Sequence, residues 1–252
     1  MSVSTVPTYA TTRASFHAVA EHVLAAVLHS ATGRIGLRAT PRGFGTPPFM
    51  VEGTDCQVRV DGIELVVKRG TSERRSLLET VGQAASLVGI EPGAPASVYP
   101  PATSVDPDRP LAIDPLAAVE IHSWFQKTSV ALGRLARRHV DLEPSAAQLW
   151  PEHFDLAITM AGVNYGGSPG DADHLSPYAY VGPWDLNGLE GAFWNEPFGA
   201  SRTSEQTASV DGMYEFFREG CVLTTPGSRP AVTNGARTGQ CDDRAQPAQG
   251  AP

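Results

Sequence analysis

Residues 148–184 (QLWPEHFDLAITMAGVNYGGSPGDADHLSPYAYVGPW) decide the fold of the second half of the chain. Over residues 154–160, apolar side chains alternate with polar or small ones, which is the period-2 pattern of a half-buried strand. Ala161 and Gly162 suit a two-residue turn, and residues 163–168 then return as a second strand. The segment therefore predicts an antiparallel hairpin.

The two-residue turn also fixes which side chains share a face of this hairpin. Because successive side chains of a strand point to opposite faces, one face is apolar and the other is polar, with small residues between the polar ones. The predicted polar face carries Asp155, Ala157, Thr159, Asn164, Gly166 and Ser168, with His153 at its edge.

This polar face has two interpretations. The first is the wet side of an ordinary antiparallel sheet, which is a common arrangement. The second is the floor of a binding site, where small residues let a ligand approach hydrogen-bonding groups. The continuation over residues 166–174 (GGSPGDADH) keeps the second interpretation open, because it adds glycines, carboxylates and a histidine. It matches neither a phosphate-binding loop nor a calcium loop.

Length and composition are typical of a globular protein. The chain has 252 residues, of which 41% are hydrophobic and 18% charged, so one large domain or two small ones are expected. The net charge of −8 argues against nucleic acid as a partner. No apolar run has the length of a membrane span, and the N-terminal residues lack the pattern of a signal peptide. We therefore expect a cytoplasmic protein with neither nucleic acid nor a membrane as its partner.

Periodicity over the rest of the chain predicts an α+β fold with mostly antiparallel sheets and flanking helices. Helices are expected near residues 13–30, 75–88, 114–139 and 209–219. The two halves share the outline helix, strands, helix, so a duplicated unit is one explanation that the sequence leaves open. The expected organisation is a flexible tail at 1–12, a first α/β half at 13–90, a proline-rich connection at 91–113, a second half with the candidate site at 114–224, and a disordered tail at 225–252.

Two local patterns in the first half have structural interpretations. Asp61-Gly62 separates two strand-like runs and is predicted to be the central pair of a type I′ turn, which would place Val60 opposite Ile63. His22, on the helix expected at 13–30, lies away from the apolar positions of that helix and is interpreted as a surface histidine.

The segments LWPEHFDLA (149–157) and NYGGSPGD (164–171) resemble the signature of a bacterial family of unknown function, which combines W-P-x-H-F-D with N-x-G-x-S-P-G-D. That family also begins with a helix that runs into a strand, much as residues 29–41 do here. Residues 40–51 differ, because they contain Phe, Gly and Pro where the family is rich in Trp and His. The resemblance implies membership of this family and no established reaction.

The candidate site combines the ionisable and aromatic residues of this region. His153, Asp155 and Asp171 are the candidate catalytic residues: histidine ordinarily titrates near neutral pH, and the carboxylates can orient it or share a cation with it. The candidate ligand-binding residues are Trp150, Glu152, Asn164, Ser168, Tyr180 and Trp184.

Three function classes fit these residues. The best supported is small-molecule binding in an aromatic-walled pocket over a polar sheet face. The alternatives are a metal-assisted or acid/base enzyme of hydrolase type that uses His153 and nearby carboxylates, and a structural or interaction module with no small-molecule site. The sequence identifies no cofactor, no metal and no oligomeric state.

Overall fold

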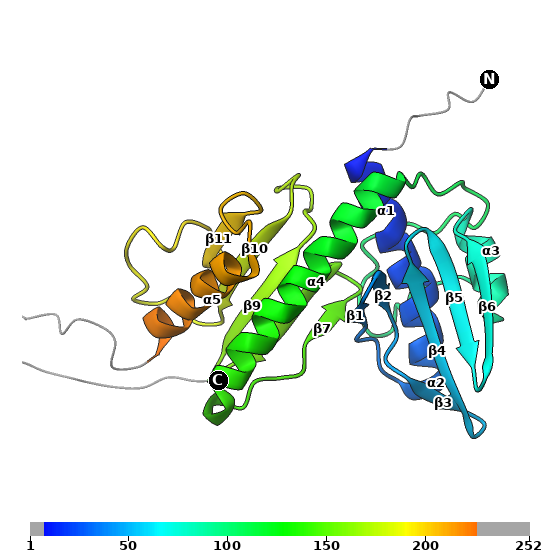
Figure 1. Cartoon of the computed structure of the whole chain (residues 1–252), viewed down its shortest axis with the longest axis horizontal. Coiled ribbons are helices and arrows are strands. Elements are labelled where there is room, and N and C mark those ends of the chain that lie inside the picture. Colours follow the sequence, from blue (N-terminus) through cyan, green and yellow to red (C-terminus); the bar gives the residue numbers. More distant parts are fainter. Residues whose placement is uncertain (1–7, 226–252) are drawn as a thin grey trace, which may run out of the picture.

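The computed structural model describes residues 8–225, and within them the chain forms two antiparallel sheets, of six and five strands, with flanking helices (Figure 1). This confirms the predicted α+β class. The tails predicted at 1–12 and 225–252 lie largely outside the described residues. No helix within 8–225 combines the length and the apolar character needed to cross a membrane.

The first sheet has the strand order β1-β2-β4-β5-β6, with β3 paired to β4. A long helix packs on it and begins at Tyr9, earlier than predicted, because the Thr8 side chain caps it by accepting from the Thr11 N–H. The helix comprises α1 (Tyr9–Val19), the π-helical η1 (Ala20–Ala25) and α2 (Ala26–Thr32). The other elements are β1 (Arg38–Thr40), β2 (Gly43–Gly45), β3 (Phe49–Val51), β4 (Thr54–Asp61), β5 (Glu64–Arg69), β6 (Ser72–Leu77) and α3 (Val81–Val88).

The turn between β4 and β5 differs from the predicted type I′ turn. Asp61 pairs with Glu64, so the central residues are Gly62 and Ile63, and only Gly62 has a positive φ, of 68°. Positive φ at the first central residue alone is the pattern of a type II′ turn. The shift places Val60 opposite Leu65, and both side chains are buried in the core.

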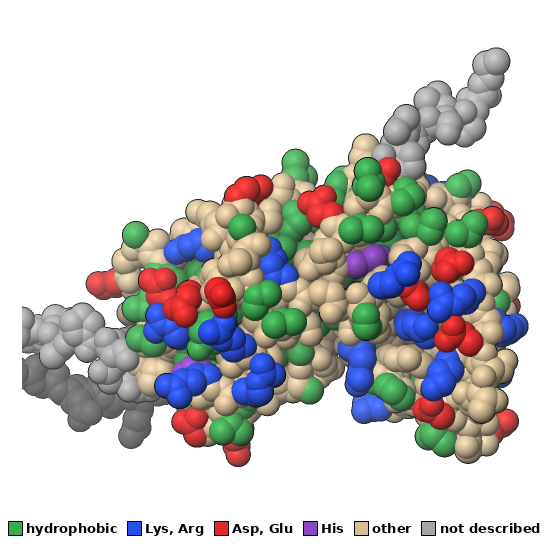
Figure 2. Space-filling model, in the orientation of Figure 1, with side chains coloured by type: hydrophobic (Ala, Val, Ile, Leu, Met, Phe, Trp, Pro, Cys, Tyr) green, Lys and Arg blue, Asp and Glu red, His purple; other side chains and the backbone are tan. Residues whose placement is uncertain are grey.

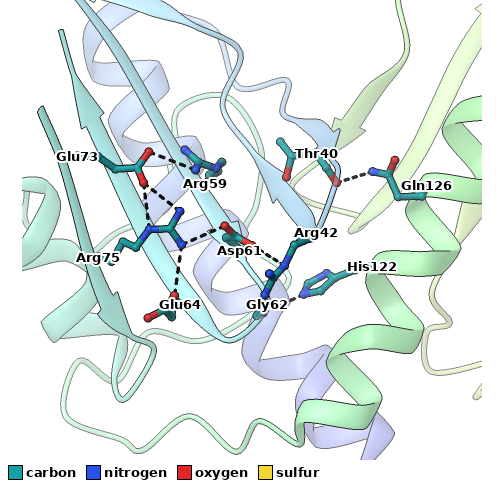
Figure 3. Close-up of polar contacts among 10 residues, drawn as sticks. All are labelled: Thr40, Arg42, Arg59, Asp61, Gly62, Glu64, Glu73, Arg75, His122 and Gln126. Carbon is teal, nitrogen blue, oxygen red and sulfur yellow. Dashed lines mark hydrogen bonds and ion pairs between the residues drawn. The ribbon is translucent and has the colours of Figure 1, made fainter. Parts of the chain in front are cut away.

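Ion pairs cover the exposed face of this sheet. Arg75 lies among Asp61, Glu64 and Glu73, and Arg59 also contacts Glu73, as Figure 3 shows. Lys and Arg side chains alternate with Asp and Glu side chains over the same part of the surface in Figure 2. Charged side chains on an edge strand such as β6 discourage pairing with another chain, since a partner strand would have to bury them.

We expect Gly62→Ala to lower the free energy of unfolding by about 1 kcal/mol, because alanine resists the positive φ at this position. Gly93→Ala is the matched control, since Gly93 has no positive φ and nothing within 4 Å of an added Cβ atom. Urea denaturation measures both variants. Equal stability of the two variants would contradict the type II′ assignment.

The second sheet has the order β11-β10-β9-β8-β7. Its central hairpin has the predicted register, since Thr159 pairs with Asn164 and Ala157 with Gly166. The connecting residues Ala161 and Gly162 have φ values of 50° and 75°, as a type I′ turn requires. The elements are α4 (Pro115–Arg138), η2 (Val140–Leu142), β7 (Gln148–Trp150), β8 (Asp155–Met160), β9 (Val163–Ser168), β10 (Tyr178–Pro183), β11 (Ala200–Thr203) and α5 (Val210–Thr224).

The two sheets meet at one point and share one core. Leu37 and Leu149 exchange two backbone hydrogen bonds of 2.9 Å, which join the chain just before β1 to β7. Helix α4 crosses this junction and packs on β1 and β2 of one sheet and on β8 and β9 of the other (Figure 1). A single cluster of buried apolar side chains therefore extends through both halves.

Four phenylalanines form the centre of this core. The ring of Phe44 on β2 lies 5.1 Å from that of Phe154 and 5.6 Å from that of Phe16 on α1. Phe125 on α4 contacts Phe154 edge-on at 5.3 Å. Edge-to-face pairs of this kind add to the stabilisation that burial provides.

We expect Phe154→Ala to lower the free energy of unfolding by about 3–5 kcal/mol, because it leaves a cavity where both sheets meet α4. Phe198→Ala is the control, since the Phe198 side chain is 39% exposed and should change stability by less than about 1 kcal/mol. Guanidinium denaturation of both variants tests this. Similar losses would show that the junction is not a stability centre.

Candidate functional site

A cleft of about 830 Å³ lies over the polar face of the second sheet. A Cβ atom added at Gly167 would meet Thr128 and Trp124 of α4, so odd-numbered positions of β9 face the helices. Gly166 and the other even-numbered positions face away from the helices, toward the cleft. The predicted polar face is thus the cleft floor.

The structure brings most of the predicted site residues together around this cleft. Trp150 lies beside it, in an adjoining pocket of about 320 Å³ that also contacts Glu152 and Asp155. The predicted residues that line the main cleft are Glu152, His153, Asp155, Asn164, Ser168, Asp171, Tyr180 and Trp184.

Asp155 is the most unusual group on the floor. Its carboxyl is buried, with 7% of the residue exposed, and Oδ2 accepts a hydrogen bond from the Tyr180 hydroxyl. Oδ1 has no hydrogen-bond partner among the described residues. Burial raises the pKa of Asp155 from 3.8 to about 6, opposed by the Tyr180 hydrogen bond and the nearby His153. The charge of Glu152 raises this pKa further.

Gly166 makes the contact between Tyr180 and Asp155 possible. The Tyr180 ring lies directly over Gly166, where an added Cβ atom would come within 2.5 Å of the tyrosine hydroxyl oxygen. Any larger residue would push the ring away from the carboxylate. The glycine in the hairpin therefore gives room to a protein side chain, where the sequence had suggested room for a ligand.

Asp171 serves the loop that forms one wall of the cleft. Its Oδ1 accepts from the backbone N–H groups of Asp173 and His174, at 2.8 and 2.7 Å, and its Oδ2 accepts from the Tyr178 hydroxyl at 2.6 Å. Burial raises the pKa of Asp171, but these hydrogen bonds outweigh burial and hold it below its ordinary value. Ser168 also holds this loop, because its hydroxyl accepts from the N–H of Gly170 and donates to the Gly170 carbonyl.

Helix α1 supplies a wall that the sequence did not indicate. Arg13 donates to the carbonyl oxygens of Asp171 and Leu175, at 3.0 and 3.3 Å. The His17 ring stacks on Phe154 at 5.3 Å, and its Nε2 donates to the Pro151 carbonyl at 2.8 Å. Burial lowers the pKa of His17. Helix α1 therefore contacts both the loop after β7 and the loop after β9, which carry predicted site residues.

The proline-rich connection forms part of the cleft through Ala102 and Thr103 and is held by the π-helical turn η1. Glu21 is fully buried and accepts from the backbone N–H groups of Ala102 and Thr103, at 2.9 and 2.8 Å. His22 is also buried, against the prediction of a surface position. Its Nδ1 accepts from the Ala94 N–H, so its Nε2 carries the hydrogen and donates to the Thr103 carbonyl. The wider π-helical turn explains the error, because helical periodicity of 3.6 residues does not apply there.

Further cleft residues that the sequence analysis missed are Tyr178 and Phe198, beside Arg13, His17 and Thr103. Tyr178 could have been found, since it precedes Tyr180 by two residues on the same strand face. The α1 residues carry no local signal, because only the tertiary fold brings them to the site.

Among residues 8–225, no three His, Cys, Asp or Glu side chains converge in a way that could hold a metal ion. No family model, curated protein or solved structure matches the chain.

We expect Asp155→Asn to stabilise the protein at pH 7.5 and to have little effect at pH 4. Because the folded-state pKa of about 6 lies above the ordinary 3.8, the folded protein binds more protons between these values, and stability falls as the pH rises through them. Asp155→Asn removes this pH-dependent loss of folding stability, which is on the order of 3 kcal/mol at most. Asp173→Asn, at an exposed position in the 168–174 loop, controls for the change in net charge. Thermal melting from pH 4 to 8 measures the effect, and a destabilised Asp155→Asn at pH 7.5 would contradict it.

Proposed function

We propose that the cleft binds a small molecule between the polar sheet face and aromatic walls. The observation that supports this most is the buried Asp155 carboxyl with an unpartnered oxygen at the floor of an open cleft. An unpaired buried polar group lowers stability, so its presence is best explained by a partner that binds there.

The rim of the cleft supports the same proposal. The Trp184 side chain is 71% exposed, and its indole N–H donates to the Asn164 side chain at 3.3 Å, which fixes the ring at the cleft edge. Phe198, in the connection between β10 and β11, is also partly exposed and lines the cleft. Exposed aromatic rings around a cavity provide apolar contact area for a ligand.

We also propose that the chain belongs to the bacterial family of unknown function that it resembles and that it works in the cytoplasm. The two segments that carry the resemblance, residues 149–157 and 164–171, both contribute side chains to the cleft. Their common location supports the interpretation of both segments as parts of one site.

A second candidate function is acid/base catalysis in the same cleft. It is favoured by the pKa of about 6 for Asp155, because a group that titrates near neutral pH can both take and return a proton. In this mechanism Asp155 is the general base, Tyr180 orients it, and His153 at the rim is the second ionisable group. A catalytic role predicts that Asp155→Asn stops turnover while a ligand still binds.

We expect Gly182→Leu to weaken ligand binding at least about tenfold, a loss of ~1.4 kcal/mol in binding free energy. Gly182 lines the cleft, and an added Cβ atom there would have its nearest neighbours at 3.7 Å, so the leucine fills the cleft without displacing the strand. Ser123→Leu, on the exposed face of α4, is the matched control.

The experiment is a ligand-observed NMR screen of a fragment library that contains cationic, neutral and anionic compounds. Fragments that bind the wild type and Ser123→Leu but not Gly182→Leu support the cleft as the binding site. A library without binders, or binders that do not distinguish the variants, would overturn the proposal.

A further inference from the structure

We propose that the ligand of this cleft carries a protonated amine, which binds at the floor between Asp155 and Glu152. This inference rests on the proposed binding function and specifies the chemistry of the ligand. It depends on hydrogen-bonding groups without partners, on carboxylates that form no ion pair with Lys or Arg among residues 8–225, and on the aromatic rings beside them.

Two buried carboxylate oxygens at the floor have no hydrogen-bond partner among residues 8–225: Asp155 Oδ1 and Glu152 Oε2. Glu152 is close enough to Asp155 for its negative charge to raise the pKa of Asp155. Ionised carboxylates only accept hydrogen bonds, so what the two acidic groups lack is a donor. An ammonium group offers three N–H donors and can satisfy several acceptors at once.

The negative charge of the carboxylates at the floor also favours a cationic group on the ligand. No Lys or Arg side chain in the described part of the chain forms an ion pair with Asp155 or Glu152. Arg13, the guanidinium group of the cleft, instead donates to backbone carbonyls of the 171–175 loop. A ligand cation would therefore form charge-assisted hydrogen bonds with carboxylates that form no ion pair with Lys or Arg in the described part of the chain.

The tyrosines beside the floor favour a cation further. Tyr178 and Tyr180 have ring centroids 6.2 Å apart, and the Tyr180 hydroxyl is already committed to Asp155. Aromatic faces attract cations, and the attraction is stronger where water is excluded. A metal ion is a poorer fit, because three ligating side chains do not converge here within residues 8–225.

Three probes of similar size and different charge test the inference: benzylamine, benzyl alcohol and benzoate. Each is titrated into the full chain at pH 7.5, and binding is followed by tryptophan fluorescence and ligand-observed NMR. We expect benzylamine to bind at least about tenfold more tightly than benzyl alcohol, and benzoate more weakly than either.

Asp155→Asn and Glu152→Gln should abolish this preference, so that benzylamine and benzyl alcohol bind alike. Asp173→Asn removes an exposed carboxylate of the 171–175 loop and should leave the preference unchanged. A thermal melt of each variant verifies that it is folded. Retained amine preference in both floor variants would overturn the assignment to this pair of carboxylates.

The outcomes separate the inference from the proposed function. If neutral or anionic fragments bind the cleft as tightly as amines and lose binding in Gly182→Leu, the amine assignment is wrong and the binding function stands. If amines bind but Gly182→Leu does not weaken them, they bind elsewhere and the inference is overturned. If no fragment of any charge binds, both proposals are wrong.

Discussion

The contact between Phe44 and Phe154 is the interaction on which the rest of the structure depends. The Phe44 ring comes from β2 and the Phe154 ring from the turn between β7 and β8, and the two rings meet edge-on at 5.1 Å. Phe154 reaches this position from a backbone with φ of 52°, a conformation that non-glycine residues rarely adopt. This backbone conformation costs roughly 1–3 kcal/mol. Burial of the Phe154 ring in the core contributes more than this, so the strained conformation is retained.

The same turn positions the candidate site. Phe154, the last residue of the turn before β8, is buried in the core, and Asp155, the first residue of β8, lines the cleft. The core contact therefore fixes where the carboxylate lies at the floor of the cleft. His17 of α1 stacks on the same Phe154 ring, so this one aromatic ring adjoins the cleft floor residue Asp155 in sequence and the α1 wall in space.

Local rules predicted the hairpin of the second half because every local preference agreed. Ala161 and Gly162 adopt positive φ, and the alternation of the strands allows one register only. At Asp61-Gly62 the local signal was equally strong, but the turn lies one residue later, with Val60 opposite Leu65. The predicted and the observed registers both place Val60 and Leu65 on the buried face, so alternation does not select between them. The polar face and most of its residues were therefore predictable, whereas the position of the first turn was not.

The α1 wall could not be predicted, because it exists only when the two halves are docked. Arg13 bonds to the carbonyl of Asp171, which lies 158 positions later in the chain, and the π-helical turn carries Glu21 to the connection at 102–103. Glu21 is a buried carboxylate, and buried polar groups stabilise a structure only when all their partners are in place. Docking of the first helix and completion of the cleft are thus one event, so that a chain with separated halves would retain the sheet floor and lose the site.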